Sequence, residues 1–514
     1  MTIRWDGVRG RGRPRHTLHI VKGLLILNPI PKVPSARRKK SASFVLQAKR
    51  TLMQTNEYDL IVIGSGPAGQ KGAICAAKMR KKVAIIDRRL TMGGVCVHTG
   101  TIPSKVLREA VLYLSGLRQR MFYGRGYVVK DRIMMSDLVL RAQSVMTREV
   151  DVIKAQLRRN YVTALEGDAH FADPHTIEIV SEEGVQQVRG EKILIACGTR
   201  PAHIDGIPVD GQRIFDSDQV HLIEEIPREL IVVGAGIIGL EYASMFAALG
   251  VKVTLLDQRP TLLDFVDREI IESLCFQLRQ LGTVFRVGEK VVSVGFDEER
   301  DKVFAALESG KKIRGQALLY TIGRQANSDK LRIEAAGLSA EARGKLVVNE
   351  HFQTAVPHIY AAGDVIGFPA LASTSMEQGR LAGCHMFGKP SRLLPNLIPY
   401  GIYTIPEISM VGATEEELTR SKTPYESGLA RYSELAKGQM LGDDQGLLKI
   451  LFDPDTLKLL GVHIIGDRAA EIVHIGQVVL TMGATIEYFR DTVFNYPTLA
   501  EAYKVAALDG LNKL

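Results

Sequence analysis

Short apolar runs of four to seven residues recur along the chain, and the first of them ends in a glycine-rich turn. This run covers residues 58–63 and leads into Gly64-Ser-Gly66-Pro-Ala-Gly69, after which the chain is rich in Ala and Lys. A continuous apolar run of this length is typical of a buried strand, and the stretch after the glycines is typical of a helix. A second run, 83–86, ends at Asp87. The pattern predicts a strand, a tight turn, a helix and a second strand.

This turn has the spacing of a dinucleotide-binding fingerprint. One glycine makes the turn, one lets the backbone approach a pyrophosphate, and one allows the helix to pack closely on the strand. The helix N-terminus favours phosphate charge. Asp87, eighteen residues past Gly69, can accept both hydroxyls of an adenosine ribose. A plain glycine turn is the alternative, but the flanking strand, helix and acid favour a dinucleotide site.

The same pattern returns in the middle of the chain. A run at 229–233 precedes Gly234-Ala-Gly236-Ile-Ile-Gly239, and a run at 251–257 ends at Asp257. Asp257 suits the free 2′-hydroxyl of NAD, whereas Arg259, two residues on, could face the 2′-phosphate of NADP. The alternative is that Arg259 is a solvated loop residue. Two dinucleotide sites in one chain are therefore expected, and the second has mixed nucleotide preference.

The last part of the chain has no nucleotide motif of its own. It combines strand-like runs at 447–452 and 459–465 with an amphipathic helical stretch at 469–482. This mixture predicts an α+β domain.

Charge is distributed unevenly along the 514 residues. The net charge is +9, yet residues 1–56 hold 13 Lys and Arg against one acid, Asp6, which leaves 53 basic and 56 acidic side chains elsewhere. The body of the protein is thus mildly acidic, and nothing in it suggests nucleic-acid binding. The apolar patch at 24–27 is too short to span a bilayer and is soon broken by Pro29 and Pro31. No membrane partner is expected.

Three interpretations of the basic extension remain open. It is a disordered tail, an Arg-rich organelle-targeting peptide, or an over-long gene start with translation beginning near Met53. We favour the third, because the recognisable domain begins just after Met53.

The five cysteines are scattered, odd in number and without metal-ligand spacing. They indicate reduced thiols in a reducing compartment and no metal site. Cys75 and Cys197 lie in apolar surroundings and are interpreted as core packing.

The segment 93–105, Gly-Gly-Val-Cys-Val-His-Thr-Gly-Thr-Ile-Pro-Ser-Lys, resembles the active-site segment of the flavoprotein disulfide reductases, the class I pyridine nucleotide-disulfide oxidoreductases. That family has two cysteines five residues apart. The first is present as Cys96, but the second, which touches the flavin in the family, is replaced by Thr101. A hydroxyl cannot form a disulfide or pass electrons as a thiolate does.

Three further segments resemble this family in order: 196–201 (Ala-Cys-Gly198-Thr-Arg-Pro), 323–327 and 359–364. The resemblance implies an α/β fold with two Rossmann-like domains, for FAD and NAD(P), and an α+β C-terminal dimerisation domain that pairs subunits into a dimer or larger homo-oligomer. The implied boundaries are 1–55 for the basic extension, 56–202 and 323–395 for the FAD-binding domain, 203–322 for the NAD(P)-binding domain, and 396–514 for the dimerisation domain. Asp364 would bind the ribityl chain.

The C-terminal motif of the disulfide-reducing members, His-Pro-Thr-x-x-Glu, is altered here to Tyr496-Pro-Thr-x-x-Glu501. A tyrosine with a reference pKa of about 10 is a poor proton shuttle near neutrality. Both groups that thiol chemistry needs are therefore missing, so Cys96 is interpreted as a buried, redox-silent thiol, with a working thiol as the alternative. His98 and Thr101 are interpreted as groups that line the pocket.

Lys105 and Glu241 match the lysine and glutamate that pair beside the flavin ring in the family. A cation there stabilises negative charge on the ring, and the carboxylate holds it in place. The alternative is that Glu241 caps its helix or faces solvent. The residues expected to be catalytic are Lys105 and Glu241, and those expected to bind cofactor are Gly64, Gly66, Gly69, Asp87, Arg88, Arg89, Leu90, Thr91, Met92, Gly93, Gly94, Val95, Cys96, Lys105, Gly198, Gly234, Gly236, Gly239, Asp257, Arg259, Gly323, Gly363 and Asp364.

Together with Phe-Asn-Tyr-Pro-Thr at 494–498, these features resemble the Si-specific, soluble transhydrogenase branch of the family. The resemblance implies a cytoplasmic enzyme that moves hydride from NADPH to NAD⁺ and back through FAD. Since FAD occupies one dinucleotide site, donor and acceptor are expected to take turns at the other in a ping-pong cycle. Two alternatives are a lipoamide-dehydrogenase-like disulfide reductase or diaphorase, and a flavin-bound scaffold without turnover.

Overall fold

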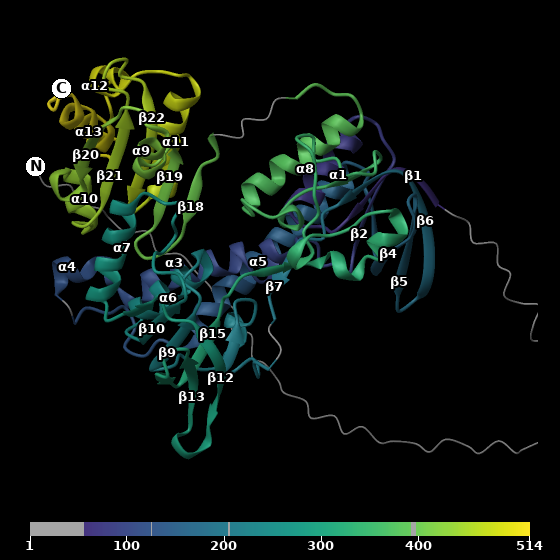
Figure 1. The fold of residues 1–514 in the computed structure, drawn as a ribbon, viewed down its shortest axis with the longest axis horizontal. Coiled ribbons are helices and arrows are strands. Elements are labelled where there is room, and N and C mark those ends of the chain that lie inside the picture. The colour runs from purple at the N-terminus through teal and green to yellow at the C-terminus, as the bar shows by residue number, and fades with distance from the viewer. Residues whose placement is uncertain (1–55, 125, 204–205, 392–396) are drawn as a thin grey trace, which may run out of the picture. The chain divides into compact units, whose positions relative to one another are not determined.

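The computed structural model describes residues 56–124, 126–203, 206–391 and 397–514 (Figure 1). The predictions for the basic extension, residues 1–55, lie outside the described residues. None of the described helices combines the length and the apolar character needed to cross a bilayer.

The first glycine loop belongs to a seven-stranded sheet with the order β3-β2-β1-β6-β5-β4, in which β17 also pairs with β6. Strands β3, β2, β1, β6 and β17 run parallel, while β4 and β5 extend the sheet antiparallel. The strands are β1 (Asn56–Ile63), β2 (Val83–Asp87), β3 (Thr163–Glu166), β4 (Asp168–Asp173), β5 (Thr176–Ser181), β6 (Gly184–Ile195) and β17 (Ile359–Ala361). The apolar run at 60–63 is almost completely buried, as expected for a parallel strand covered on both faces.

Helices α1 (Pro67–Lys78) and α8 (Ala372–Met386) pack on this sheet and against each other (Figure 1). Helix α5 (Met135–Arg159) packs in the same core. Between α1 and α5 in sequence lie α2 (Gly94–His98), α3 (Thr101–Ser115) and α4 (Arg120–Tyr123). The apolar side of α3, including Leu107 and Val111, joins the core of the second glycine-loop sheet instead. Sequence patterning did not predict that α3 packs against the second sheet.

The second glycine loop belongs to a five-stranded parallel sheet with the order β11-β10-β9-β15-β8. The strands are β8 (Ile214–Asp216), β9 (Glu229–Val233), β10 (Lys252–Asp257), β11 (Val284–Val287) and β15 (Ala317–Tyr320), and the helices are α6 (Ile237–Ala248) and α7 (Arg268–Gln280). A separate antiparallel sheet contains β12 (Val291–Asp297), β13 (Lys302–Leu307) and β14 (Lys312–Gly315).

The chain enters and leaves this middle region through two strands that lie side by side. β7 (Thr199–Pro201) pairs antiparallel with β16 (Arg324–Ala326). The predicted domain boundaries near residues 203 and 322 fall next to this pair, and we retain them as a proposal.

The C-terminal part is built on an antiparallel sheet with the order β18-β19-β22-β21-β20. Its strands are β18 (Tyr400–Ile402), β19 (Ile408–Gly412), β20 (Glu426–Arg431), β21 (Leu447–Phe452) and β22 (Leu459–Ile465), and its helices are α9 (Glu415–Ser421), α10 (Ala436–Leu441), α11 (Ala469–Thr481), α12 (Glu487–Asp491) and α13 (Glu501–Leu511). The two predicted strands and the predicted helix at 469–482 are therefore confirmed, as is the fold class.

Buried polar contacts join the helices of the middle region to the C-terminal sheet. Lys449 on β21 is 2% exposed, and its Nζ lies 3.0 Å from Asp267 at the start of α7. Glu269 and Glu415 also contact this ammonium group, at 3.1 and 2.8 Å. The Ser244 hydroxyl on α6 accepts a hydrogen bond from the Ile405 backbone N–H at 2.9 Å. We call these contacts the polar seam.

Candidate functional site

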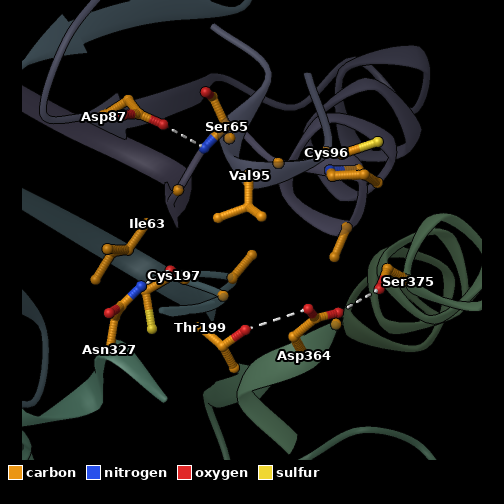
Figure 2. Close-up of a pocket in the computed structure, with 18 of the residues that line it drawn as sticks. Ile63, Ser65, Asp87, Val95, Cys96, Cys197, Thr199, Asn327, Asp364 and Ser375 are labelled. Carbon is orange, nitrogen blue, oxygen red and sulfur yellow. Dashed lines mark hydrogen bonds between the residues drawn. The ribbon is translucent and has the colours of Figure 1, made fainter. Parts of the chain in front are cut away.

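A cavity lies where β1, β2 and β6 end at the first sheet (Figure 2). Parts of the chain far apart in sequence line it, among them the first glycine loop, the turn after β6 and the start of α8. The carboxyl edge of parallel strands is where α/β sheets bind ligands.

The glycine loop has the geometry that its spacing predicts. A Cβ on Gly69 would lie 1.9 Å from the Gly64 carbonyl oxygen, so only glycine lets the helix approach the strand this closely. Gly66, in contrast, faces open space, because a Cβ there would meet no described atom within 4 Å. A backbone that is open at this point and followed by the N-terminus of α1 suits a pyrophosphate.

Asp87 holds this loop in place. Its Oδ2 accepts a hydrogen bond from the Ser65 backbone N–H at 2.8 Å (Figure 2), and the Ser65 hydroxyl accepts one from the Gly93 N–H at 3.0 Å. Within the described residues, Oδ1 of Asp87 makes no hydrogen bond, and the side chain lines the cavity. One carboxylate oxygen therefore orders the loop, while the other is left to accept a hydrogen bond from a ligand.

Asp364 lies at the far side of the same cavity, between Thr199 and Ser375 (Figure 2). The Thr199 hydroxyl donates to its Oδ2 at 3.3 Å, and the Ser375 hydroxyl donates to its Oδ1 at 3.4 Å. Sequence reasoning missed both hydroxyl residues. Thr199 directly follows the predicted Gly198, so that motif gave a signal for it, whereas no pattern singled out Ser375.

Cys96 and Thr101 both line the cavity. Burial raises the pKa of the Cys96 thiol, and a hydrogen bond with the Thr101 side chain opposes that rise. The thiol is half-buried, whereas a buried thiol was expected. The raised pKa nevertheless agrees with a thiol that is mostly protonated near neutrality.

The interpretation of Cys75 and Cys197 as core packing needs correction. Cys197 packs against the core of the first sheet, but it is half-buried and also lines the cavity. Cys75 is half-buried as well, and its Sγ lies 3.5 Å from the Sγ of Cys384. The apolar neighbours in sequence concealed that both side chains lie at the edge of the core.

Lys105 and Glu241 form an ion pair between α3 and α6, with Nζ and Oε2 2.7 Å apart. Glu241 is 4% exposed, and its Oε1 accepts a hydrogen bond from the Tyr403 backbone N–H at 2.8 Å. The alternative that Glu241 faces solvent was therefore wrong. Lys105 lies one helical turn after Thr101, so the two residues share one face of α3.

The second glycine loop repeats the geometry of the first. A Cβ on Gly239 would lie 1.9 Å from the Gly234 carbonyl oxygen, while a Cβ on Gly236 would again meet no described atom within 4 Å. Asp257 Oδ2 accepts a hydrogen bond from the Ala235 backbone N–H at 2.7 Å, as Asp87 does in the first loop. The two loops thus share a backbone arrangement that suits a dinucleotide.

Arg259 forms a bidentate ion pair with Asp257. Its Nε and Nη2 donate to the two carboxylate oxygens at 3.0 and 2.9 Å. Burial alone would raise the pKa of Asp257, but the bonds from Arg259 hold that pKa below its usual range. The Arg259 side chain is 47% exposed. Arg259 is therefore accessible to solvent, as the interpretation as a solvated loop residue expected. That interpretation did not include the ion pair with Asp257.

The structure separates the predicted cofactor residues into those that line the cavity and those that do not. The ones that line it are Gly64, Gly66, Asp87, Arg88, Gly94, Val95, Cys96, Gly198, Gly363 and Asp364. Among the ones outside its lining, Gly69 packs the helix, Met92 is buried in the core, and Leu90 is 41% exposed. Arg89, Thr91, Gly93 and Gly323 are not among the lining residues either.

The altered position of the C-terminal motif lies at the surface of the described chain. Tyr496 is 72% exposed. The Glu501 Oε2 is buried and has no hydrogen-bond partner within the described residues. An exposed phenol therefore stands at the motif position where the disulfide-reducing members of the family carry histidine.

Residues 58–379 match the pyridine nucleotide-disulphide oxidoreductase family, and residues 398–507 match its dimerisation domain. The chain is 54% identical over 460 residues to the soluble pyridine nucleotide transhydrogenase of Mycobacterium tuberculosis (strain ATCC 25177 / H37Ra), and the matched region covers 89% of this chain and 98% of the relative. It is 46% identical to the protein of the same name from Klebsiella pneumoniae, with 89% and 99% coverage.

Solved structures with this fold include the HOCl-induced flavoprotein disulfide reductase RclA from Escherichia coli, as its Cu(II) complex, and LpdA from Mycobacterium tuberculosis. Both have a TM-score of 0.80 and cover 88% of this chain and 99% of their own, at 26% and 25% identity. The family matches span most of the described sheets and both glycine loops. The chain therefore belongs to the pyridine nucleotide-disulphide oxidoreductase family of FAD- and NAD(P)-dependent enzymes.

Proposed function

We propose that this protein transfers hydride between NADPH and NAD⁺, with FAD as the intermediate carrier. One observation carries the proposal. The Lys105–Glu241 pair is assembled at 2.7 Å, whereas the position of the flavin-side cysteine holds Thr101 and the position of the proton-shuttling imidazole holds Tyr496. The names of the two transhydrogenase relatives support the same assignment.

The residues around the cavity fit FAD. Gly66 and the N-terminus of α1 would hold the pyrophosphate, Asp87 the adenosine ribose, and Asp364 the ribityl chain. When bound, FAD supplies a ring that accepts a hydride and gives it back. Asp364 is oriented for this task from both sides, because each of its carboxylate oxygens already accepts a hydroxyl hydrogen bond.

Lys105 would supply positive charge where the substrate hydride arrives. Glu241 keeps the ammonium group in position through Oε2, while its second oxygen is anchored to the Tyr403 backbone. The Lys105 ammonium also lies 4.9 Å from the centre of the Tyr403 ring. A cation held on two sides needs little reorganisation when charge develops beside it.

The second glycine loop would receive donor and acceptor in turn. Steady-state kinetics with both nucleotides varied should give parallel double-reciprocal lines, as expected when one product leaves before the second substrate enters. Intersecting lines would contradict the shared site. Appreciable oxidation of dihydrolipoamide would instead support a disulfide reductase, the activity named for RclA. A flavin that is not reduced by NADPH under anaerobic conditions would indicate a scaffold.

The Asp257–Arg259 pair would allow the site to accept both nucleotides. Asp257 can bind the free 2′-hydroxyl of NAD, and Arg259 can bind the 2′-phosphate of NADP. In either case the bonds between Arg259 and Asp257 would open first. The pair is half-exposed on the Arg259 side, so a ligand can reach it.

Replacing Arg259 with alanine should lower kcat/KM for NADPH by an amount equivalent to about 1–3 kcal/mol of activation free energy, because a charge-assisted bond to phosphate is lost. Use of NADH should change little, since Asp257 remains available. The ratio of kcat/KM for the two nucleotides measures this. Arg268→Ala, which removes an exposed arginine of the same region, is the matched control. Equal losses with both nucleotides would contradict the assignment.

The dimerisation-domain match supports a homo-oligomer. We propose the cytoplasm as the compartment.

A further inference from the structure

Two thiols lie together outside both nucleotide loops. Cys75 on α1 and Cys384 on α8 are 309 residues apart in sequence, and their Sγ atoms are 3.5 Å apart. Both are free thiols, and the proposed hydride transfer uses neither. Within the described residues no group of three or more possible ligands could hold a metal ion, so the pair is not part of such a cluster.

Glycines bring these two helices together. A Cβ on Gly379 would lie 2.0 Å from the Ala68 carbonyl oxygen, and one on Gly383 would lie 3.2 Å from the Cys75 Cβ. The helix backbones are therefore in direct contact beside the thiols. Since a disulfide has an S–S length of about 2.05 Å, the two sulfur atoms must approach by only about 1.5 Å.

The thiols lie at the wall of a second cavity of ≈ 600 Å³. Its other walls come from α1, the end of α5 and the end of α8, and none of the described lining residues is acidic. The cations that line it are Lys71, Lys78, Arg159, Arg380 and Lys389. The Arg380 Nη1 lies 3.6 Å from the Cys384 Sγ. Glu377, outside the lining, forms an ion pair with Arg380, while the other four cations have no ion-pair partner within the described residues. A cavity with this excess of positive charge and a dithiol can attract an anionic thiol or disulfide.

We propose that Cys75 and Cys384 are a second reactive site, which exchanges with a small disulfide that carries carboxylates, such as glutathione disulfide. The Cys75 thiolate attacks one sulfur of the disulfide and releases the first thiol. The Cys384 thiolate then attacks the Cys75 sulfur of the mixed disulfide and releases the second. The cysteine pair gives up two electrons and two protons and becomes a disulfide, while the small disulfide becomes two thiols.

The order of attack follows from exposure. Cys75 is half-buried and can be reached from the cavity, whereas Cys384 is 1% exposed and lies beneath it. Burial, and next the hydrogen bond with Cys384, raise the pKa of Cys75 to about 11, although Arg380 and Lys389 oppose the rise. Since the thiolate is the nucleophile, exchange should be slow at neutral pH and should accelerate about tenfold per pH unit below that pKa.

The site lies on the two helices that begin at the flavin cavity. Ala68, near the N-terminus of α1, and Ser375, in the first turn of α8, both line that cavity. A disulfide between the helices would cross-link them behind the cofactor site without occupying it.

Incubating the full-length holoenzyme with glutathione disulfide at about pH 9 tests the proposal. The wild type should lose two thiols, and peptide mass mapping should find the Cys75–Cys384 disulfide. The Cys384→Ser variant should stop at a glutathione adduct on Cys75, because the resolving thiol is missing. The Cys75→Ser variant should not react. Cys275→Ser, which removes a thiol from α7, should behave as the wild type.

Charge gives a second readout that needs no variant. At low salt the wild type should react with glutathione disulfide at least about tenfold faster than with the cationic disulfide cystamine, and added salt should reduce the difference. Cys75 and Cys384 both remaining as thiols in the wild type, an equal rate with both disulfides, or a reaction of Cys75→Ser equal to the wild type would each overturn the proposal.

Discussion

Replacing Lys105 with methionine should slow the reduction of the bound flavin by NADPH about 100- to 1000-fold, the typical cost of losing one preorganised charge at a reacting centre. The structure holds this ammonium group between the Glu241 carboxylate and the Tyr403 ring, and the family resemblance implies a place beside the flavin. Stopped-flow loss of the oxidised flavin absorbance under anaerobic conditions measures the effect.

Two controls separate charge from structure. Lys105→Arg keeps a cation and should retain most of the rate, while Glu241→Gln keeps the hydrogen bond to the Tyr403 N–H and should give an intermediate loss. Flavin content and the circular dichroism spectrum should match the wild type. An unchanged reduction rate in Lys105→Met with bound flavin intact would exclude this residue from hydride transfer.

Replacing Lys449 with methionine should lower the free energy of unfolding by about 3–5 kcal/mol, because Asp267 would remain buried and charged without its partner. Lys449 and Asp267 are 2% and 1% exposed. Burial would lower the pKa of Lys449, but the hydrogen bond from its ammonium group to Glu415 and the charge of Asp267 raise it above its usual range. The group is therefore charged in the folded protein.

Urea unfolding followed by circular dichroism measures this loss. Lys290→Met is the matched control, since the Lys290–Glu308 pair is 57% and 66% exposed, and removing it should cost at most about 1 kcal/mol. The double variant Lys449→Met, Asp267→Asn should recover much of the loss, because the buried charge at residue 267 is removed while an amide oxygen can still accept the Glu269 N–H at the start of α7. A Lys449→Met protein as stable as the control would show that the buried ion group does not stabilise the fold.

The sequence predicts the local units well because each is encoded in consecutive residues. The strand, glycine turn and acid at Asp87 follow from spacing alone, and the structure has them at β1, α1 and β2. The same holds for Asp257 after the second loop. Periodicity and turn chemistry act over a few residues, so such units can be read directly.

Contacts between distant segments could not be read in this way. The 3.5 Å approach of Cys75 and Cys384 depends on how two helices pack, and nothing near either cysteine in sequence encodes it. The bond from Ser375 to Asp364 has the same origin. Lys105 and Glu241 were paired only through the family resemblance, because 136 residues separate them.

The polar seam has a mechanical consequence. Within the seam, the Ile405 N–H donates to Ser244 of α6, and Lys449 binds the start of α7. Two residues before Ile405, the Tyr403 N–H also donates to Glu241 of α6. A hinge at this place would have to break several buried bonds at once, each expensive to leave unmade. In the proposed cycle, each nucleotide would therefore replace the previous one while α6 and α7 keep their place against the C-terminal sheet, so that only loops and side chains need to move.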